Sequence, residues 1–221
     1  MSYLRKNITG SHDPAYKRRK SDSDIWMKPD HFRRMLKHIK KNPANRDLRD
    51  RDYMLMVLMG NMALRVSEVA ILRIDQFSGA RGRVPKITVK AKKKRSSAAT
   101  KTIYIHPRVL DKVKAYIKKH TYAGDEYLFI GGTGNGHLGE RQISNIFNTY
   151  ADGCGFREAY STHALRHMYG VLAYERTNDL LFIRDQMGHS TMDKNLGVTD
   201  RYIHLSPKRA KTCIEKMRYI L

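Results

Sequence analysis

The chain has 221 residues and carries 43 lysines and arginines against 21 aspartates and glutamates, a formal net charge of +22. Such a surplus favours a polyanionic partner, because each phosphate that a basic side chain neutralises releases counterions. A hydrophobic content of 41% is enough to build a real core. No apolar run approaches the roughly 18 residues of a membrane helix, and only two cysteines are present, Cys154 and Cys213, which argues against a disulfide scaffold. We expect a soluble intracellular protein that binds nucleic acid, with an anionic membrane surface or a structural RNA as the alternative partners.

The N-terminal 22 residues are basic and lack apolar periodicity, with Arg5, Lys6 and the run from Lys17 to Lys20. This composition predicts a flexible basic arm or linker over residues 1–22, or a solvated tail with no specific role. Residues 23–221 show no internal repeat and are expected to form one domain.

Helices are predicted in the first part of this domain. One begins near Pro29, which suits a first helical turn, and a second begins at about Arg46 and is broken at Gly60 or Asn61. In the first of them, apolar residues recur at helical spacing at Phe32, Met35, Leu36 and Ile39.

A short helix is expected from Glu68 to Leu72, with Ser67 as its N-cap. Arg65 would then lie at a helix–helix junction, beside the positive end of a helix, where a phosphate can bind. An ion pair between Arg65 and Glu68 is the alternative use of this arginine.

The periodicity changes over residues 83–105. Residues 86–90 and 102–105 are rich in β-branched and aromatic side chains and predict two strands. The segment between them, residues 91–99, contains Lys92, Lys93, Lys94 and Arg95. We interpret it as a basic hairpin tip that can reach into a DNA groove, or as a charged loop that only aids solubility.

Further helices are predicted from Pro107, from about residue 141 to 150, from 163 to about 174, from 179 to 187 and from 207 to about 219. Gly188 ends the fourth of these, and a short helix is expected around Tyr202. Residues 126–130 form a short buried segment, and the glycine-rich residues 131–136 form a loop that lacks the ending of a phosphate-binding motif. The predicted class is therefore mainly α with a small antiparallel β-sheet (α+β).

The residues best suited to phosphate chemistry lie in the last third of the chain. His163 and Arg166 are three apart on a predicted helix and share one face, while Leu165 points to the core. His163 and His167 could be read as a zinc pair, but no third ligand follows at a recognisable spacing, and we predict no metal site. His189 and Tyr202 follow, each of which would alone be assigned a structural role.

Taken in order, these motifs resemble the tyrosine recombinase (phage integrase) family. The set is Arg65, a basic hairpin, His163-x-x-Arg166, Gly188-His189 and Tyr202-x-His204. Residues 63–68, Ala-Leu-Arg-Val-Ser-Glu, are similar to the family's first arginine box, and residues 163–167 are similar to its second. The resemblance covers residues 24–218, the family's catalytic domain. Other tyrosines, at 169, 174 and 219, lack the Tyr-x-His context.

The resemblance implies a mechanism. Tyr202 would attack a DNA phosphate and form a 3′-phosphotyrosyl link, with His163 as the proton acceptor, because a free phenol has a pKa of about 10. Arg65 and Arg166 would bind the non-bridging oxygens through paired N–H donors, and His189 would add a hydrogen bond. A lysine of the hairpin would protonate the leaving 5′-oxygen. Lys92 matches its position best, although Lys93 and Lys94 remain open, and these two with Arg95 would contact DNA.

The family's chemistry needs no metal, ATP or other cofactor. The resemblance implies double-stranded DNA as the partner, an active homo-oligomer (a tetramer on paired sites), no membrane association, and the cytoplasm of a bacterium or host cell. Residues 23–221 would be the catalytic domain, without the separate core-binding domain of most family members. The predicted function is site-specific recombination, as an integrase, resolvase or invertase. The alternatives are an idle DNA-binding protein on the same fold and a type IB topoisomerase-like enzyme.

Overall fold

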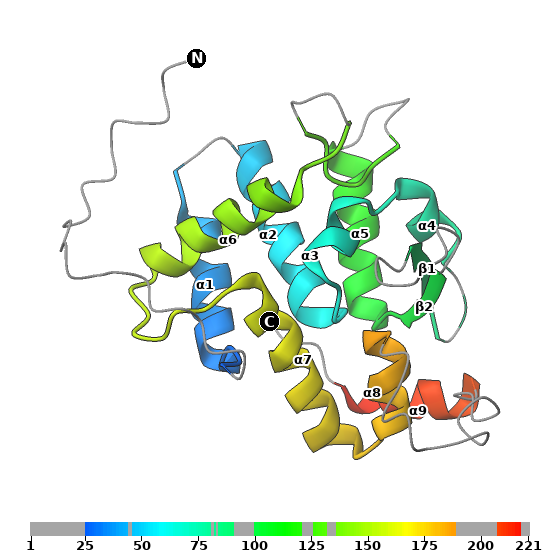
Figure 1. The fold of residues 1–221 in the computed structure, drawn as a ribbon. Helices are drawn as coiled ribbons and strands as arrows, with labels where there is room; N and C mark the ends of the chain where they lie inside the picture. The colour runs from blue at the N-terminus through cyan, green and yellow to red at the C-terminus, as the bar shows by residue number, and fades with distance from the viewer. Residues whose placement is uncertain are drawn as a thin grey trace.

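The computed structural model describes residues 25–43, 46–80, 82, 84–90, 100–120, 126–131, 136–188 and 207–217. Within these ranges, nine α-helices and one two-stranded antiparallel sheet follow one another along the chain (Figure 1). They are α1 (Pro29–Lys41), α2 (Arg46–Asn61), α3 (Val66–Ala70), α4 (Ile74–Ser78), β1 (Lys86–Lys90), β2 (Thr100–Tyr104), α5 (Pro107–His120), α6 (Glu140–Gly153), α7 (Thr162–Thr177), α8 (Leu180–Met187) and α9 (Pro207–Lys216). The predicted fold class is confirmed.

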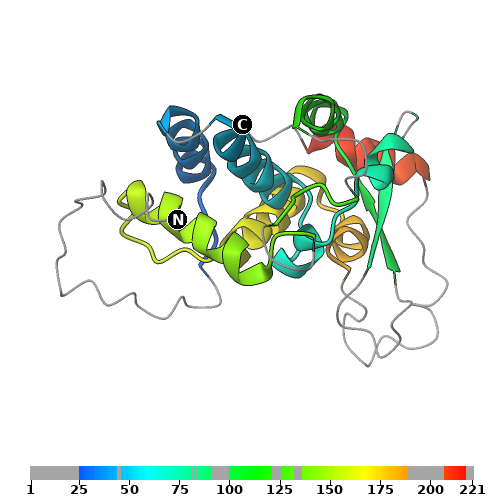
Figure 2. The same ribbon diagram turned by 90° about the horizontal axis from the view of Figure 1, so that it is seen from above.

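Helix α2 forms the centre of the main core. All of its residues from Met54 to Asn61 are buried, as expected of a helix that is apolar on every side. It packs against α1, α5 and α7 (Figure 2). The approach of α1 is close, since a Cβ on Gly60 would lie 2.4 Å from Cζ of the buried Phe32. A glycine is therefore needed where these two helices meet.

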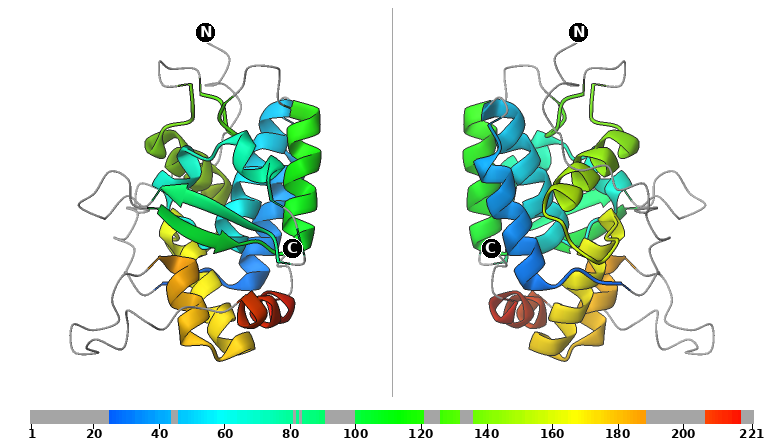
Figure 3. Two further views of the ribbon diagram at one scale, coloured as in Figure 1. Left: turned by 90° about the vertical axis from the view of Figure 1, so that its right-hand side faces the viewer. Right: turned by 90° about the vertical axis from the view of Figure 1, so that its left-hand side faces the viewer.

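The β-hairpin joins the helices through side-chain and backbone contacts. β1 and β2 pair in antiparallel register, with Ile87 opposite Ile103, and both of these residues are buried. The Gln186 side chain of α8 accepts from the Tyr104 backbone N–H at 3.0 Å and donates to its carbonyl at 2.6 Å. These two bonds satisfy a strand edge beside which the described residues place no further strand, and they attach the end of α8 to β2 (Figure 3).

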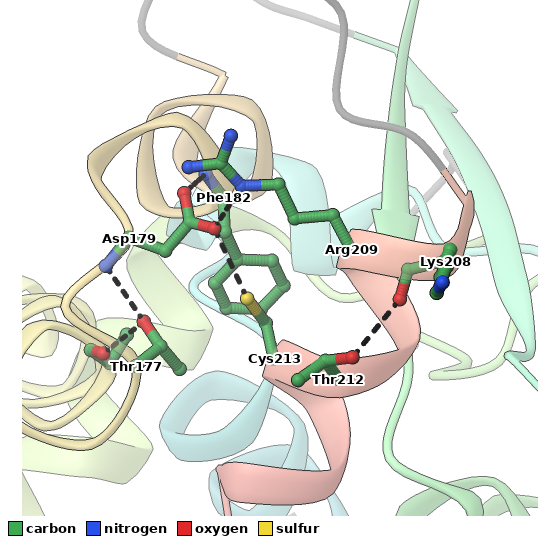
Figure 4. A network of polar contacts seen from close by, with 8 residues as sticks. Thr177, Asp179, Phe182, Lys208, Arg209, Thr212 and Cys213 are labelled. Atoms are coloured by element: carbon green, nitrogen blue, oxygen red, sulfur yellow. Dashed lines mark hydrogen bonds and ion pairs between the residues drawn. The ribbon is translucent and has the colours of Figure 1, made fainter.

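A second, smaller core lies where α9 packs against α7 and α8. A polar cluster around Asp179 accompanies it (Figure 4). The Asp179 carboxylate caps α8 by accepting from the Phe182 backbone N–H at 3.0 Å, pairs with Arg209 and accepts from the Cys213 thiol. Although burial by itself would raise the pKa of Asp179, these donors hold it below its usual range. One carboxylate thus joins the start of α8 to α9.

Some predicted boundaries were wrong. Helix α3 begins at Val66 and its N-cap is Arg65, so Ser67 is inside the helix. The reason is that the Glu68 carboxylate accepts from the Arg65 backbone N–H at 2.8 Å, which closes the first turn two residues earlier. Helix α3 ends at Ala70, two residues before the predicted end, and a separate short helix, α4, begins at Ile74.

Two further elements are longer than predicted. β2 begins at Thr100 because that residue pairs with Lys90, at the end of β1. Helix α7 continues to Thr177 and ends where Asn178 adopts a left-handed conformation, with φ at 50°. Residue type alone does not show where the pairing of β2 with β1 begins or which residue of α7 adopts the left-handed conformation.

Candidate active site

A solvent-open cavity of about 490 Å³ lies where α3, the start of α6 and the start of α7 meet. Arg65, His163 and Arg166, three of the predicted site residues, line it together. Its remaining walls are formed by Leu64, Val66, Ser67, Glu140 and Thr162. The structure thus brings together residues about 100 positions apart in the sequence.

Arg65 occupies the α2–α3 junction, as predicted, and its side chain is 23% exposed. Nη1 donates to Glu68 Oε1 at 3.1 Å, so the expected ion pair forms as well. The two uses of this arginine are compatible. The carboxylate contacts one edge of the guanidinium, and the residue still lines the cavity.

Arg166 is almost fully buried, with 2% of its surface exposed. Its guanidinium donates to the carbonyls of Ala63, in the α2–α3 link, and of Met187, at the end of α8. Burial lowers the pKa of Arg166 to about 10, and the positive charge of Arg65 adds to this effect. A second guanidinium is thereby held at fixed orientation beside the first, which is the arrangement an anionic oxygen requires.

His163 lies on the exposed edge of the same cavity. Its ring makes an edge-on contact with His167, with a centroid separation of 4.5 Å, so the predicted i, i+4 neighbours do meet. Leu165 is buried, as expected from the helical spacing. The first two turns of α7 therefore present one imidazole and one guanidinium to the cavity.

Sequence reasoning missed one charged residue at this place, Lys101. It projects from β2, not from the hairpin tip, and its side chain is only 8% exposed. Nζ lies 2.8 Å from Glu68 Oε2. Burial lowers the pKa of Lys101 to about 8 against the opposing attraction of Glu68, and the charges of Arg166 and Arg65 contribute to the lowering. The alternation of strand residues was the available signal, because Lys101 shares a strand face with the buried Ile103.

Comparison with known proteins identifies the chain's family. The model of the phage integrase family matches residues 25–209. The chain belongs to the phage integrase family. A tyrosine recombinase of Pseudothermotoga lettingae is 27% identical over 211 residues, covering 95% of this chain and 65% of that protein.

Solved structures share the fold at lower identity. The integrase from mycobacterium phage Brujita matches with a TM-score of 0.64 and 20% identity, over 92% of this chain and 61% of that one. The XerH site-specific recombinase bound to its palindromic difH substrate matches with a TM-score of 0.63 and 19% identity, over 77% of this chain and 48% of that one. The chain thus spans between about half and two thirds of the length of these phage integrase relatives.

Several predicted residues of the family's motifs lie outside the described part of the chain. They are Lys92, Lys93, Lys94, Arg95, His189 and Tyr202. The described residues that flank the last two are Gly188, which ends α8 with φ at 62°, and Pro207, which begins α9. Of the alternative tyrosines, Tyr169 is buried in the second core, where burial raises the pKa of its phenol, and Tyr174 is exposed on α7.

Neither a metal cluster nor a membrane-spanning helix is found among the described residues. They contain no group of three or more His, Cys, Asp or Glu side chains placed to hold a metal ion. None of the helices in these ranges is long and apolar enough to cross a membrane.

Proposed function

We propose that this chain cuts and rejoins duplex DNA at specific sites through a covalent tyrosyl–phosphate intermediate. The observation that carries the proposal is the pair of guanidiniums, Arg65 and Arg166, lining one cavity together with His163. Two fixed cations suit a phosphodiester whose non-bridging oxygens gain charge in the transition state. The net charge of +22 supports a DNA partner, and the phage integrase fold supports recombination over other phosphate chemistry.

The reaction assigns each group one role. The Tyr202 hydroxyl gives its proton to His163, and its oxygen forms a bond to phosphorus as the bond from phosphorus to the 5′-oxygen breaks. The leaving 5′-oxygen takes a proton from a hairpin lysine, for which Lys92 is our choice. His189 donates to the charged oxygens. Attack by a different 5′-hydroxyl reverses these steps and releases the tyrosine, so the bond energy is conserved without ATP.

The test is covalent trapping on nicked duplexes drawn from the DNA that flanks the chain's own coding region. A nick beside the scissile phosphate lets the short 5′-hydroxyl strand diffuse away, so that the covalent adduct accumulates. We expect an adduct that maps to Tyr202 by peptide analysis, is lost in Tyr202→Phe and persists in Tyr174→Phe, the control at an exposed tyrosine. An adduct that survives Tyr202→Phe would move the nucleophile to another residue.

The arginines have a matched control within the chain. Arg65→Lys and Arg166→Lys should each slow adduct formation on the order of 10²-fold, because an ammonium cannot reproduce paired N–H donors. Arg73 is also a helix N-cap whose backbone N–H bonds to a side chain three residues later, at 2.8 Å, but it pairs with Glu126 away from the cavity. Arg73→Lys should leave the rate unchanged.

Two other functions predict different results in the same experiment. An idle DNA-binding protein would bind these duplexes tightly and give no adduct on any nicked substrate. A type IB topoisomerase-like enzyme would form the adduct but relax supercoiled plasmids without needing paired sites. A recombinase should form recombinant product only when two sites are present. We propose that a homo-oligomer, a tetramer on paired sites, performs this reaction.

A further inference from the structure

Lys101 is a buried cation inside the cluster of charges that surrounds the candidate site. Its side chain is 8% exposed, and Nζ lies 2.8 Å from Glu68 Oε2. Beyond this ion pair, Nζ has no acceptor in hydrogen-bond geometry within the described residues. A buried ammonium is costly unless it is paired, so the burial of Lys101 depends on Glu68.

The partner carboxylate is the point at which several elements meet. Glu68 is 1% exposed. It accepts from the Arg65 backbone N–H at 2.8 Å and from Arg65 Nη1 at 3.1 Å, and it pairs with Lys101. Because Lys101 lies against Oε2 while Nη1 of Arg65 uses Oε1, the lysine restricts the carboxylate to the rotamer that orients Arg65.

The aliphatic part of Lys101 contacts the end of α8. A Cβ on Gly188 would lie 2.6 Å from Lys101 Cδ, so the lysine packs directly over this glycine. Gly188 immediately precedes His189 in the sequence. The neighbouring Met187 carbonyl accepts from Arg166. Lys101 therefore contacts both Glu68, which bonds to Arg65, and Gly188, which precedes His189 in the sequence.

The charges of the cluster suit the proposed reaction. Arg65, Arg166 and Lys101 each carry one positive charge, and Glu68 carries one negative charge. Without Lys101, Glu68 would cancel one of the two arginines. With Lys101 protonated, the cluster keeps a surplus equal to the two negative charges of a five-coordinate phosphorane.

We propose that Lys101 is a positioning residue for phosphodiester cleavage, which holds Glu68 and the end of α8 so that Arg65 is correctly placed. The inference rests on the proposed function. It separates Lys101 from the lysines of the hairpin tip, among which we place the proton donor to the leaving group. Two different lysines of one hairpin then have two roles. One protonates the 5′-oxygen, and Lys101 positions Arg65.

The first experiment compares adduct formation by Lys101→Met, Glu68→Gln and the double variant on the nicked substrate. Lys86→Met is the matched control, since Lys86 is exposed on β1 of the same hairpin. We expect Lys101→Met to slow adduct formation at least 10-fold at saturating DNA, with the dissociation constant for DNA changed less than 3-fold. The double variant removes the unpaired charge and should recover thermal stability without recovering the rate. Recovery of the rate along with stability would show that Lys101 only neutralises Glu68, and would overturn the inference.

A second substrate distinguishes positioning from proton donation. When sulfur replaces the bridging 5′-oxygen, the leaving group needs no proton, so loss of the acid is rescued. Lys92→Met should be rescued and Lys101→Met should remain slow. Rescue of Lys101→Met by this substrate would make Lys101 the proton donor and end the positioning role. If Lys101→Met and Lys86→Met form the adduct at equal rates, the positioning role is also ruled out. If the unsubstituted protein forms no adduct on any nicked duplex, the proposed function falls and the inference falls with it.

Discussion

Replacing Lys101 by methionine should change how the stability of the fold depends on pH. The unfolded lysine has a pKa near 10.5, and burial lowers the folded value to about 8. Between these two values the unfolded chain binds more protons than the folded one, so the free energy of unfolding rises with pH. Below pH 8 the ammonium is charged in both states, and its full burial penalty is present.

The magnitude follows from the two pKa values. The difference between 10.5 and about 8, at about 1.4 kcal/mol for each pH unit, corresponds to about 3 kcal/mol. Most of this, about 2–3 kcal/mol, should have appeared by pH 10. Because the side chain is only 8% exposed, screening by solvent reduces the figure little.

The free energy of unfolding can be measured at pH 7, 8, 9 and 10 by urea titration, with the fluorescence of Trp26, the single tryptophan, as the signal. The quantity to compare is the unfolding free energy of the unsubstituted protein minus that of Lys101→Met. Burial raises the pKa of Tyr116 and Tyr150 to about 12, and this lowers stability above pH 10 in both proteins, so it cancels in the difference. Two parallel pH curves would refute the assignment of Lys101 as a buried, titrating cation.

Three further predictions concern packing and capping. Gly60→Ala should lower the free energy of unfolding by about 1–3 kcal/mol in urea titrations, because its Cβ would overlap the ring of Phe32. Adding Phe32→Leu should recover part of this loss. A Gly60→Ala protein of unchanged stability would contradict the close contact. Tyr150→Phe should cost about 1–2 kcal/mol in the same assay, since it removes the hydroxyl that donates to Oδ2 of the buried Asp52 at 3.0 Å. Asp179→Ala should lower the free energy of unfolding by about 1–2 kcal/mol by removing the cap of α8. The substitution should also speed amide hydrogen exchange more in α9 than in α1. An equal effect on both helices would show that the carboxylate does not hold α9.

Local residue patterns carried much of the prediction. The apolar spacing of α1 and the spacing of His163 and Arg166 on α7 depend only on the geometry of one helix, so they could be read directly. The same holds for Gly188 as the end of α8. The start of α3 was misjudged because a serine is the usual N-cap, whereas here Glu68 bonds back to the preceding backbone.

The sequence by itself determined the helical elements, the order of the motifs and the basic charge, because each depends on residues close together in the chain. Only the tertiary structure decided what surrounds the arginines. Arg166 is oriented by the carbonyls of Ala63 and Met187, 103 and 21 residues away. Lys101 is placed beside Glu68 by the packing of β2 against α8. Burial and pKa depend on such long-range contacts, and a basic hairpin carries no sequence mark that tells a buried lysine from its solvated neighbours.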